Sequence, residues 1–168
     1  QNNYKGFFWN PKKAEIDTNA LTGVEVIIHL AGANVAKKWT TAYKEEIIES
    51  RVLSTQLLYK TLQKNSHQVK QIISASAVGI YPDSLTDIYH ETDLDIDVSF
   101  LGNVVKQWEN EVSQFEKLEI IVSKIRIGIV LAKNGGALQE MAKPIKYGVG
   151  AAFGAGEQYQ SWIHVQDL

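Results

Sequence analysis

The chain contains no cysteine, and this absence excludes disulfide bonds, thiol catalysis and cysteine-ligated zinc. Basic residues are not in excess, since 17 Lys and Arg stand against 19 Asp and Glu for a net charge of −2. Nothing in the composition therefore indicates binding to nucleic-acid phosphates. No apolar run approaches the roughly 20 residues of a membrane-spanning helix. The lack of cysteine fits a reducing compartment, so we expect a cytoplasmic location without membrane attachment.

What the sequence does contain is an alternation of strand-like and helical segments over 168 residues, of which 45% are hydrophobic. The first clear strand, 24–30, is β-branched and mostly apolar, which is typical of a strand buried on both faces of a parallel sheet. The alternation predicts an α/β fold, a Rossmann-like, doubly wound and mostly parallel sheet. The remaining predicted strands are 69–74, 119–131, 162–165 and an edge strand at Tyr4 to Trp9. The predicted helices are 40–63, 99–115 and 137–146.

The long predicted helix, 40–63, has an apolar arc wider than one contact with a sheet requires. A second packing partner is therefore expected, either another helix of the chain or another subunit. The second alternative predicts a homodimer.

Two loops follow predicted strands, where open α/β sheets bind their ligands. The first is Ala31-Gly32-Ala33, whose small residues let a flat cofactor approach the backbone closely. The second is 74–79, whose serine hydroxyls would face a substrate. An equally weighted alternative is that these small residues only permit tight turns. Gly150, Gly154 and Gly156 have a spacing similar to a dinucleotide motif, but no buried strand precedes them, so we interpret this segment as a substrate-side loop.

Several segments together resemble one family, the atypical epimerase-like branch of the extended short-chain dehydrogenases/reductases. They occur in the family's order: Val26-Ile27-Ile28-His29-Leu30-Ala31-Gly32, Ser50-Arg51-Val52-Leu53, Ser74-Ala75-Ser76-Ala77-Val78-Gly79-Ile80-Tyr81, Arg126-Ile127-Gly128 and Ser161-Trp162-Ile163-His164. The resemblance implies a nucleoside-diphosphate-sugar epimerase family protein that binds NADP, or else NAD. It also implies that residues 1–168 are the central part of one cofactor-binding domain, with a substrate-side segment from about 135. The Gly-rich N-terminal turn and a C-terminal segment of complete members are expected to be absent.

The resemblance also assigns residues to the site. The predicted cofactor-binding residues are Leu30, Ala31, Gly32, Arg51, Ser74, Ala75 and Arg126. The predicted substrate-side residues are Gln158, Trp162 and His164. Ser76 corresponds to the catalytic serine of the family.

One departure from the wider superfamily concerns its catalytic pair, a Tyr and a Lys four residues later on one helix. In that pair the lysine stabilises the phenolate, so that the phenol can exchange a proton. None of the seven tyrosines of this chain has a Lys four residues later. With Glu109 aligned to the acidic residue that ends the family's helix, the pair's positions hold Leu101 and Val105, which cannot transfer a proton.

Another group would then have to handle the proton, and the candidates are Tyr81, Tyr89, His90 and His164. Tyr81 is the first choice beside Ser76 as a catalytic residue, although packing beneath its loop is an equally weighted role. The acidic residues between 91 and 97 lack a matching histidine, so no metal site is predicted.

Two functions remain open from the sequence. The chain is expected to belong either to an NAD(P)-linked oxidoreductase or epimerase that acts on a small carbonyl or sugar-nucleotide substrate, or to a non-catalytic NADP-binding sensor or scaffold.

Overall fold

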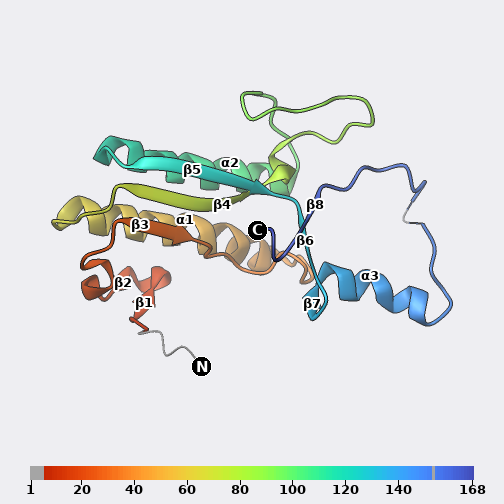
Figure 1. Cartoon of the computed structure of the whole chain (residues 1–168), viewed down its shortest axis with the longest axis horizontal. Coiled ribbons are helices and arrows are strands. Elements are labelled where there is room, and N and C mark those ends of the chain that lie inside the picture. The colour runs from red at the N-terminus through yellow and green to blue at the C-terminus, as the bar shows by residue number, and fades with distance from the viewer. Residues whose placement is uncertain (1–5, 153) are drawn as a thin grey trace.

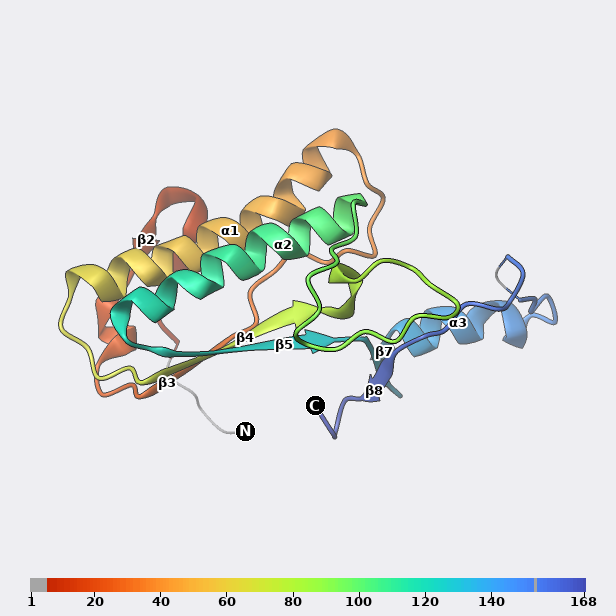
Figure 2. The same cartoon turned by 90° about the horizontal axis from the view of Figure 1, so that it is seen from above.

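The computed structural model describes residues 6–152 and 154–168 and has a three-stranded parallel sheet at its centre. The strands are β3 (Val26–His29), β4 (Gln71–Ala77) and β5 (Ile121–Ile127), in the order β3-β4-β5. Two long helices, α1 (Thr41–Lys64) and α2 (Phe100–Ser113), lie side by side on one face of this sheet (Figures 1 and 2). The predicted α/β class and the parallel pairing are confirmed.

Both helices begin at the residue types that stabilise helix N-termini. The Thr40 side chain accepts a hydrogen bond from the Tyr43 amide, and the Ser99 side chain accepts one from the Gly102 amide. Each cap satisfies a backbone N–H that has no partner within its helix. The predicted bounds of α1 were accurate to one residue, whereas the helix predicted over 99–115 continues after α2 as a 3-10 helix at Gln114–Leu118.

The hydrophobic core lies between the sheet and the two helices. Phe115 and Ile72 are completely buried there, and Leu62 is nearly so. The remaining members of this core are Leu58, Val69 and Ile120. The wide apolar arc of α1 is explained in part by α2, which packs along it as the second partner expected from the sequence.

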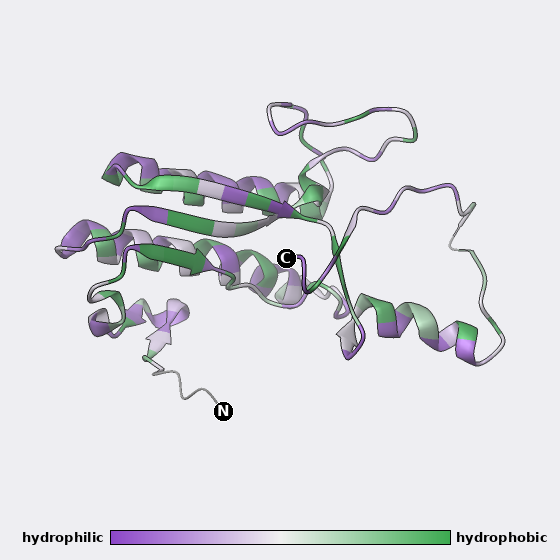
Figure 3. Cartoon of the chain, in the orientation of Figure 1, coloured by the Kyte–Doolittle hydropathy of each residue, from purple (hydrophilic) through white to green (hydrophobic). Residues whose placement is uncertain are grey.

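The opposite face of the sheet is apolar and uncovered in the described part of the chain. Val26 and Ile28 of β3 are 47% and 66% exposed, and Ile121 of β5 is 64% exposed. Figure 3 shows this face toward the viewer, with hydrophobic colour along β3. The prediction that this strand is buried on both faces was therefore wrong for this chain, because α1 and α2 cover only one of them.

The predicted strands 69–74 and 119–131 differ most from the structure at their ends. Strand β4 runs on to Ala77, so Ser74 and Ser76 lie inside a strand rather than in a loop after it. The segment predicted as one strand over 119–131 is two strands, β5 and β6 (Ile129–Ala132), separated at Gly128. A Cβ atom at Gly128 would lie 2.4 Å from the Ser161 carbonyl oxygen, so only glycine allows this close approach.

Strand β6 leaves the main sheet and belongs to a smaller one at the carboxyl ends of β3 to β5 (Figure 1). It pairs with β7 (Gly135–Gly136) and, in parallel, with β8 (Trp162–His164). Helix α3 (Ala137–Lys146) follows β7, with the bounds predicted from the sequence. This unit contains the predicted substrate-side segment.

The N-terminal region packs beside β3. It contains an antiparallel pair, β1 (Trp9–Asn10) and β2 (Glu15–Ile16), and two short 3-10 helices, Pro11–Lys13 and Thr18–Leu21. The edge strand predicted at Tyr4 to Trp9 is therefore wrong for residues 6–8, and Tyr4 lies outside the described residues. No helix in the described part of the chain is long and apolar enough to cross a membrane.

Candidate functional site

The predicted site residues gather where the three parallel strands end. Leu30, Ala31 and Gly32 follow β3 directly, and Ser76 lies near the end of β4. The strand register places Ser76 opposite Arg126 of β5 and Ser74 opposite His29 of β3. Carboxyl ends of parallel strands are where open α/β sheets bind ligands, so the sequence-based grouping is spatially consistent.

Arg51 reaches from α1 to the loop that follows β3. Its Nη2 donates a hydrogen bond to the Ala33 carbonyl oxygen (3.2 Å), and its guanidinium lies over the Trp108 ring at 5.2 Å. The Ser50 hydroxyl accepts from the Ala33 amide at 2.9 Å. A Cβ atom on Gly32 would lie 3.1 Å from the guanidinium carbon of Arg51. The loop of small residues is thus held against α1 by Ser50 and Arg51.

Ser74 belongs to a buried network around His29. The two ring nitrogens of His29 lie 3.2 Å from the Ser54 hydroxyl and 3.4 Å from the Ser74 hydroxyl. Burial disfavours the charged imidazolium and lowers the pKa of His29 to about 4. Ser74 therefore points toward the helices, and not toward the loop side where its hydroxyl was expected to face a substrate.

Ser76 also points toward the helices, and its partner is Glu109 of α2. The Ser76 hydroxyl donates to Glu109 Oε1 at 2.5 Å. Arg126 donates to both carboxylate oxygens, from Nε to Oε1 and from Nη2 to Oε2, each at 2.9 Å. Ser76 and Glu109 are only 5% and 6% exposed. The side chains of the Arg126–Glu109 ion pair are 20% and 8% exposed, so the pair is largely buried and both carboxylate oxygens accept hydrogen bonds.

The protonation state of Glu109 follows from these contacts. Burial alone would raise the pKa of its carboxyl, but the hydrogen bonds from Arg126 and Ser76, together with the charge of Arg126, outweigh burial and lower that pKa below its ordinary value. Hydrogen bonds to Glu109 in turn raise the pKa of Arg126. At neutral pH the pair is a carboxylate and a guanidinium.

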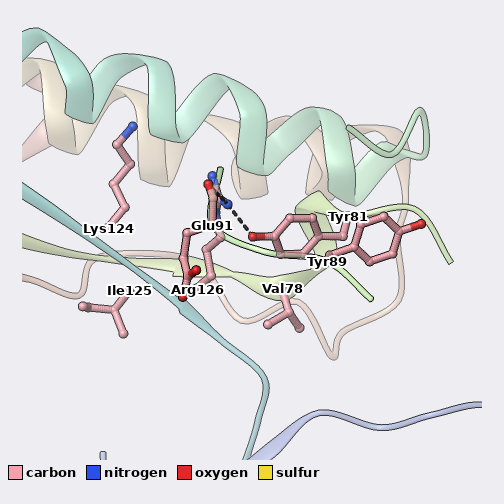
Figure 4. A pocket seen from close by; sticks show the side chains of 7 residues that line it. All are labelled: Val78, Tyr81, Tyr89, Glu91, Lys124, Ile125 and Arg126. Atoms are coloured by element: carbon pink, nitrogen blue, oxygen red, sulfur yellow. Dashed lines mark hydrogen bonds between the residues drawn. The ribbon is translucent and has the colours of Figure 1, made fainter. Parts of the chain in front are cut away.

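Tyr81 joins the same network from the loop that follows β4. Arg126 Nη1 donates to the Tyr81 phenol oxygen at 2.5 Å (Figure 4). The Tyr81 hydroxyl donates to the His90 carbonyl oxygen at 3.0 Å. The Tyr81 ring stacks on Tyr89, with a centroid distance of 5.2 Å. A cavity of about 560 Å³ opens beside these side chains, and its other lining residues are Val78, Glu91, Lys124 and Ile125.

The two positions of the missing Tyr-Lys pair lie on α2. Val105 is buried, at 4% exposure. Leu101 lines a second cavity, of about 520 Å³, together with Tyr81, Tyr159 and Ser161. This cavity lies where the loop after β4 meets the substrate-side segment.

The predicted substrate-side residues lie on the unit formed by β6, β7, β8 and α3. Gln158 lines a cavity of about 820 Å³, which Asn34 and Lys37 border from the loop after β3. His164 lies in β8, and its Nδ1 accepts a hydrogen bond from the Gln166 amide. Trp162 is 63% exposed on the same strand. The structure thus brings Gln158 close to the loop after β3.

Glu109 is the main residue that the sequence did not assign to the site. The signal that could have found it is an acidic residue on the buried side of an apolar helix, which indicates a cationic or hydroxyl partner nearby. Ala75 lies in β4 between the two serines, with its side chain on the opposite face of the strand. Within the described residues, no cluster of acidic and histidine side chains could hold a metal ion.

Comparison with known proteins places this arrangement in a family. The sequence model of the NAD dependent epimerase/dehydratase family matches residues 12–99. The chain belongs to this family. It is 40% identical over 167 residues to an epimerase family protein of Staphylococcus aureus strain MRSA252, covering 99% of the chain and 56% of that protein. A Staphylococcus saprophyticus epimerase family protein is 40% identical over 150 residues, which cover 89% of the chain and 50% of that protein. The chain thus spans about half the length of these curated relatives.

Solved structures agree with this assignment. The human epimerase family protein SDR39U1, crystallised with NADPH, is 29% identical with a TM-score of 0.74, covering 89% of the chain and 53% of that protein. The nucleoside-diphosphate sugar epimerase from Corynebacterium glutamicum is 32% identical with a TM-score of 0.77, covering 95% of the chain and 33% of that protein. At 18% identity, the UDP-glucuronic acid 4-epimerase of Bacillus cereus shares the fold, with a TM-score of 0.74, covering 89% of the chain and 48% of that protein. The Rossmann-like fold is therefore confirmed.

Proposed function

We propose that this chain is part of an NAD(P)-binding, epimerase-like oxidoreductase that acts on a small carbonyl or sugar-nucleotide substrate without the usual Tyr-Lys pair. The observation that carries the proposal is the shared edge of the sheet. There the loop Leu30-Ala31-Gly32, fixed to α1 by Arg51, lies beside the buried pair of Ser76 and Glu109. The human relative crystallised with NADPH favours NADP as the cofactor, with NAD as the alternative.

The cofactor would supply the hydride chemistry, and the residues of this chain would hold and orient it. Leu30, Ala31 and Gly32 would contact it from the end of β3, where the absence of large side chains allows close approach. Arg51, Ser74, Ala75 and Arg126 would support that position from α1, β4 and β5. The substrate would occupy the cavity of about 820 Å³ that Gln158 lines. Trp162 and His164 would act from β8, which pairs with β6 beside that cavity.

Ser76 and Tyr81 are the proposed catalytic residues. Leu101 and Val105 cannot exchange a proton, whereas the Tyr81 phenol lies 2.5 Å from a guanidinium nitrogen of Arg126. This contact gives Tyr81 a permanently cationic neighbour within hydrogen-bond distance. Lys106 is one position from Val105 on α2 and does not replace the pair by itself.

The test is a titration with NADPH and NADH of a purified longer protein that contains this chain, and binding is monitored by nicotinamide fluorescence excited through tryptophan. We expect saturable binding with preference for NADPH. Turnover is then measured as absorbance change of the nicotinamide with a panel of UDP-sugars and small aldehydes and ketones. Failure of both nucleotides to bind would contradict the proposal.

The second candidate function is a non-catalytic NADP-binding sensor or scaffold. The observation that favours it is that both proposed catalytic hydroxyls donate their hydrogen bonds inside the protein, from Ser76 to Glu109 and from Tyr81 to the His90 carbonyl. A Ser76→Ala variant that binds NADPH normally and loses turnover at least about tenfold would exclude this candidate. Normal binding with no turnover in the unmodified protein would support it.

Two further expectations belong to the whole protein. A homodimer is proposed because the arc of α1 is broad, and light scattering that gives only the monomer mass at high concentration would contradict it. A cytoplasmic location is proposed from the cysteine-free composition. Microscopy of a fluorescent fusion tests it, and a membrane-bound or secreted fusion would contradict it.

A further inference from the structure

We infer that Glu109 is a positioning residue, which fixes the direction of the Ser76 hydroxyl and connects it through Arg126 to Tyr81. The inference rests on the proposed function for its meaning in catalysis, because it concerns the two proposed catalytic residues. It adds a residue that belongs to neither the cofactor loop nor the substrate-side segment.

The hydrogen bonds of Glu109 show that it is a hydrogen-bond acceptor toward Ser76. Its Oε1 accepts from the Ser76 hydroxyl and from Arg126 Nε, and its Oε2 accepts from Arg126 Nη2. An ionised carboxylate can only accept hydrogen bonds. The Ser76 hydroxyl proton is therefore directed toward α2, away from the end of the sheet.

This direction has a consequence for the ligand. A hydroxyl that already donates its one hydrogen bond to a carboxylate still has lone pairs, so it can accept a hydrogen bond from another group. Ser76 would thus accept a hydrogen bond from a ligand hydroxyl and would not donate one to a ligand carbonyl. Glu109 thereby favours the alcohol form of a substrate at Ser76.

Arg126 extends the fixed network to Tyr81. Its Nε and Nη2 hold Glu109 in two parallel hydrogen bonds, and its Nη1 donates both to the Tyr81 phenol oxygen and to the Glu91 carbonyl oxygen. Only a planar guanidinium with several donors can make these contacts at once. A change at Glu109 should therefore be felt at Tyr81, although the two side chains share no direct hydrogen bond.

A short hydrogen bond between a buried hydroxyl and a carboxylate gives an observable signature. The hydroxyl proton exchanges slowly with water, so proton NMR should show a resolved Ser76 hydroxyl signal shifted downfield from ordinary hydroxyls. We expect this signal in the unmodified protein, its loss in Ser76→Ala, and its retention in Ser76→Thr. In Glu109→Gln it should move upfield or broaden away, because a neutral amide is a weaker acceptor than a carboxylate.

The connection to Tyr81 is measured by NMR of protein labelled with ¹³C at tyrosine Cζ. The Tyr81 signal is identified as the one that disappears in Tyr81→Phe. Glu109→Gln and Arg126→Lys should both shift the Tyr81 signal, whereas the matched control Glu116→Gln, at an exposed glutamate, should leave both signatures unchanged. Glu109→Asp should restore part of the hydroxyl shift.

A missing Ser76 hydroxyl signal in the unmodified protein would overturn the inference, even if Glu109→Gln failed to fold. So would a folded Glu109→Gln variant with both signals unchanged. These measurements need no nucleotide or substrate, so they remain decisive if NADPH binding fails.

Discussion

At the scale of single residues, buried polar side chains link the strands to the helices. His29 is 3% exposed and its ring nitrogens contact the Ser54 and Ser74 hydroxyls, so it connects β3 with α1 and β4. Its pKa of about 4 lies below the ordinary value of 6.5, which means that the folded state favours the neutral ring. The imidazolium form is disfavoured because burial removes its hydration.

We expect this histidine to make the protein less stable in mild acid. Because the folded pKa of His29 is lower than the unfolded pKa, its contribution is fully present above pH 6.5 and is lost as the pH falls toward about 4. Between pH 7 and pH 5 the loss should be about 2 kcal/mol of unfolding free energy. Urea unfolding at several pH values measures it.

His29→Gln should flatten the dependence of stability on pH over that interval, and His90→Gln, at an exposed histidine, should not. The lowered pKa of Glu109 does not interfere, because its contribution is lost only as the pH falls through values below the ordinary glutamate pKa. An unchanged slope in His29→Gln would show that His29 is not the titrating group.

At the scale of elements, periodicity and capping residues predicted helices better than strand ends. Helix α3 has its predicted bounds, and α1 differs by one residue. The end of β4 was missed because Ser74, Ala75 and Ser76 look like a loop by composition. Their strand conformation depends on pairing with β5 and on partners from other segments, His29 and Glu109. Such tertiary partners leave no local signal in the sequence.

The break between β5 and β6 was missed for a similar reason, because it depends on the approach of Ser161 to Gly128. Gly128→Ala should weaken the attachment of β8 to β6, since the new Cβ would lie 2.4 Å from the Ser161 carbonyl oxygen. We expect a cost of roughly 1–3 kcal/mol, which is typical of overpacking.

Hydrogen exchange can locate this effect. The amides of Ile129 and Val165, which donate to Ser161 and Leu131, should lose protection, while amides of β4 keep theirs. Gly79→Ala is the matched control, because a Cβ there meets no atom within 4 Å. Equal loss of protection in β4 would contradict a local effect.

At the scale of the whole molecule, helices cover one face of the sheet and none of the described residues covers the other with a helix. The exposed face carries Val26, Ile28 and Leu30 from the β3 segment and Ile121 and Ile125 from β5. Doubly wound folds carry helices on both faces of the sheet, and the curated relatives are about twice as long as this chain. We therefore expect this face to be covered when the segment is part of a longer protein.

We predict that substitutions of two isoleucines on adjacent strands change the unfolding free energy by different amounts. In this chain Ile28→Thr should change the unfolding free energy by less than about 0.5 kcal/mol, because Ile28 is 66% exposed. Ile72→Thr, at a fully buried residue facing the helices, should cost at least about 2 kcal/mol. In a longer protein that contains the same segment, Ile28→Thr should approach the cost of Ile72→Thr.

Urea unfolding of both variants in both chain lengths measures this difference, and light scattering follows the mass. If Ile28→Thr already costs as much as Ile72→Thr in this chain and also converts a dimer to a monomer, a second copy covers the face. In that case the proposed homodimer forms through the sheet and not through the arc of α1. A small cost together with an unchanged monomer mass would leave the face open in this chain, because neither helix layer nor partner then shields the β-branched side chains from water.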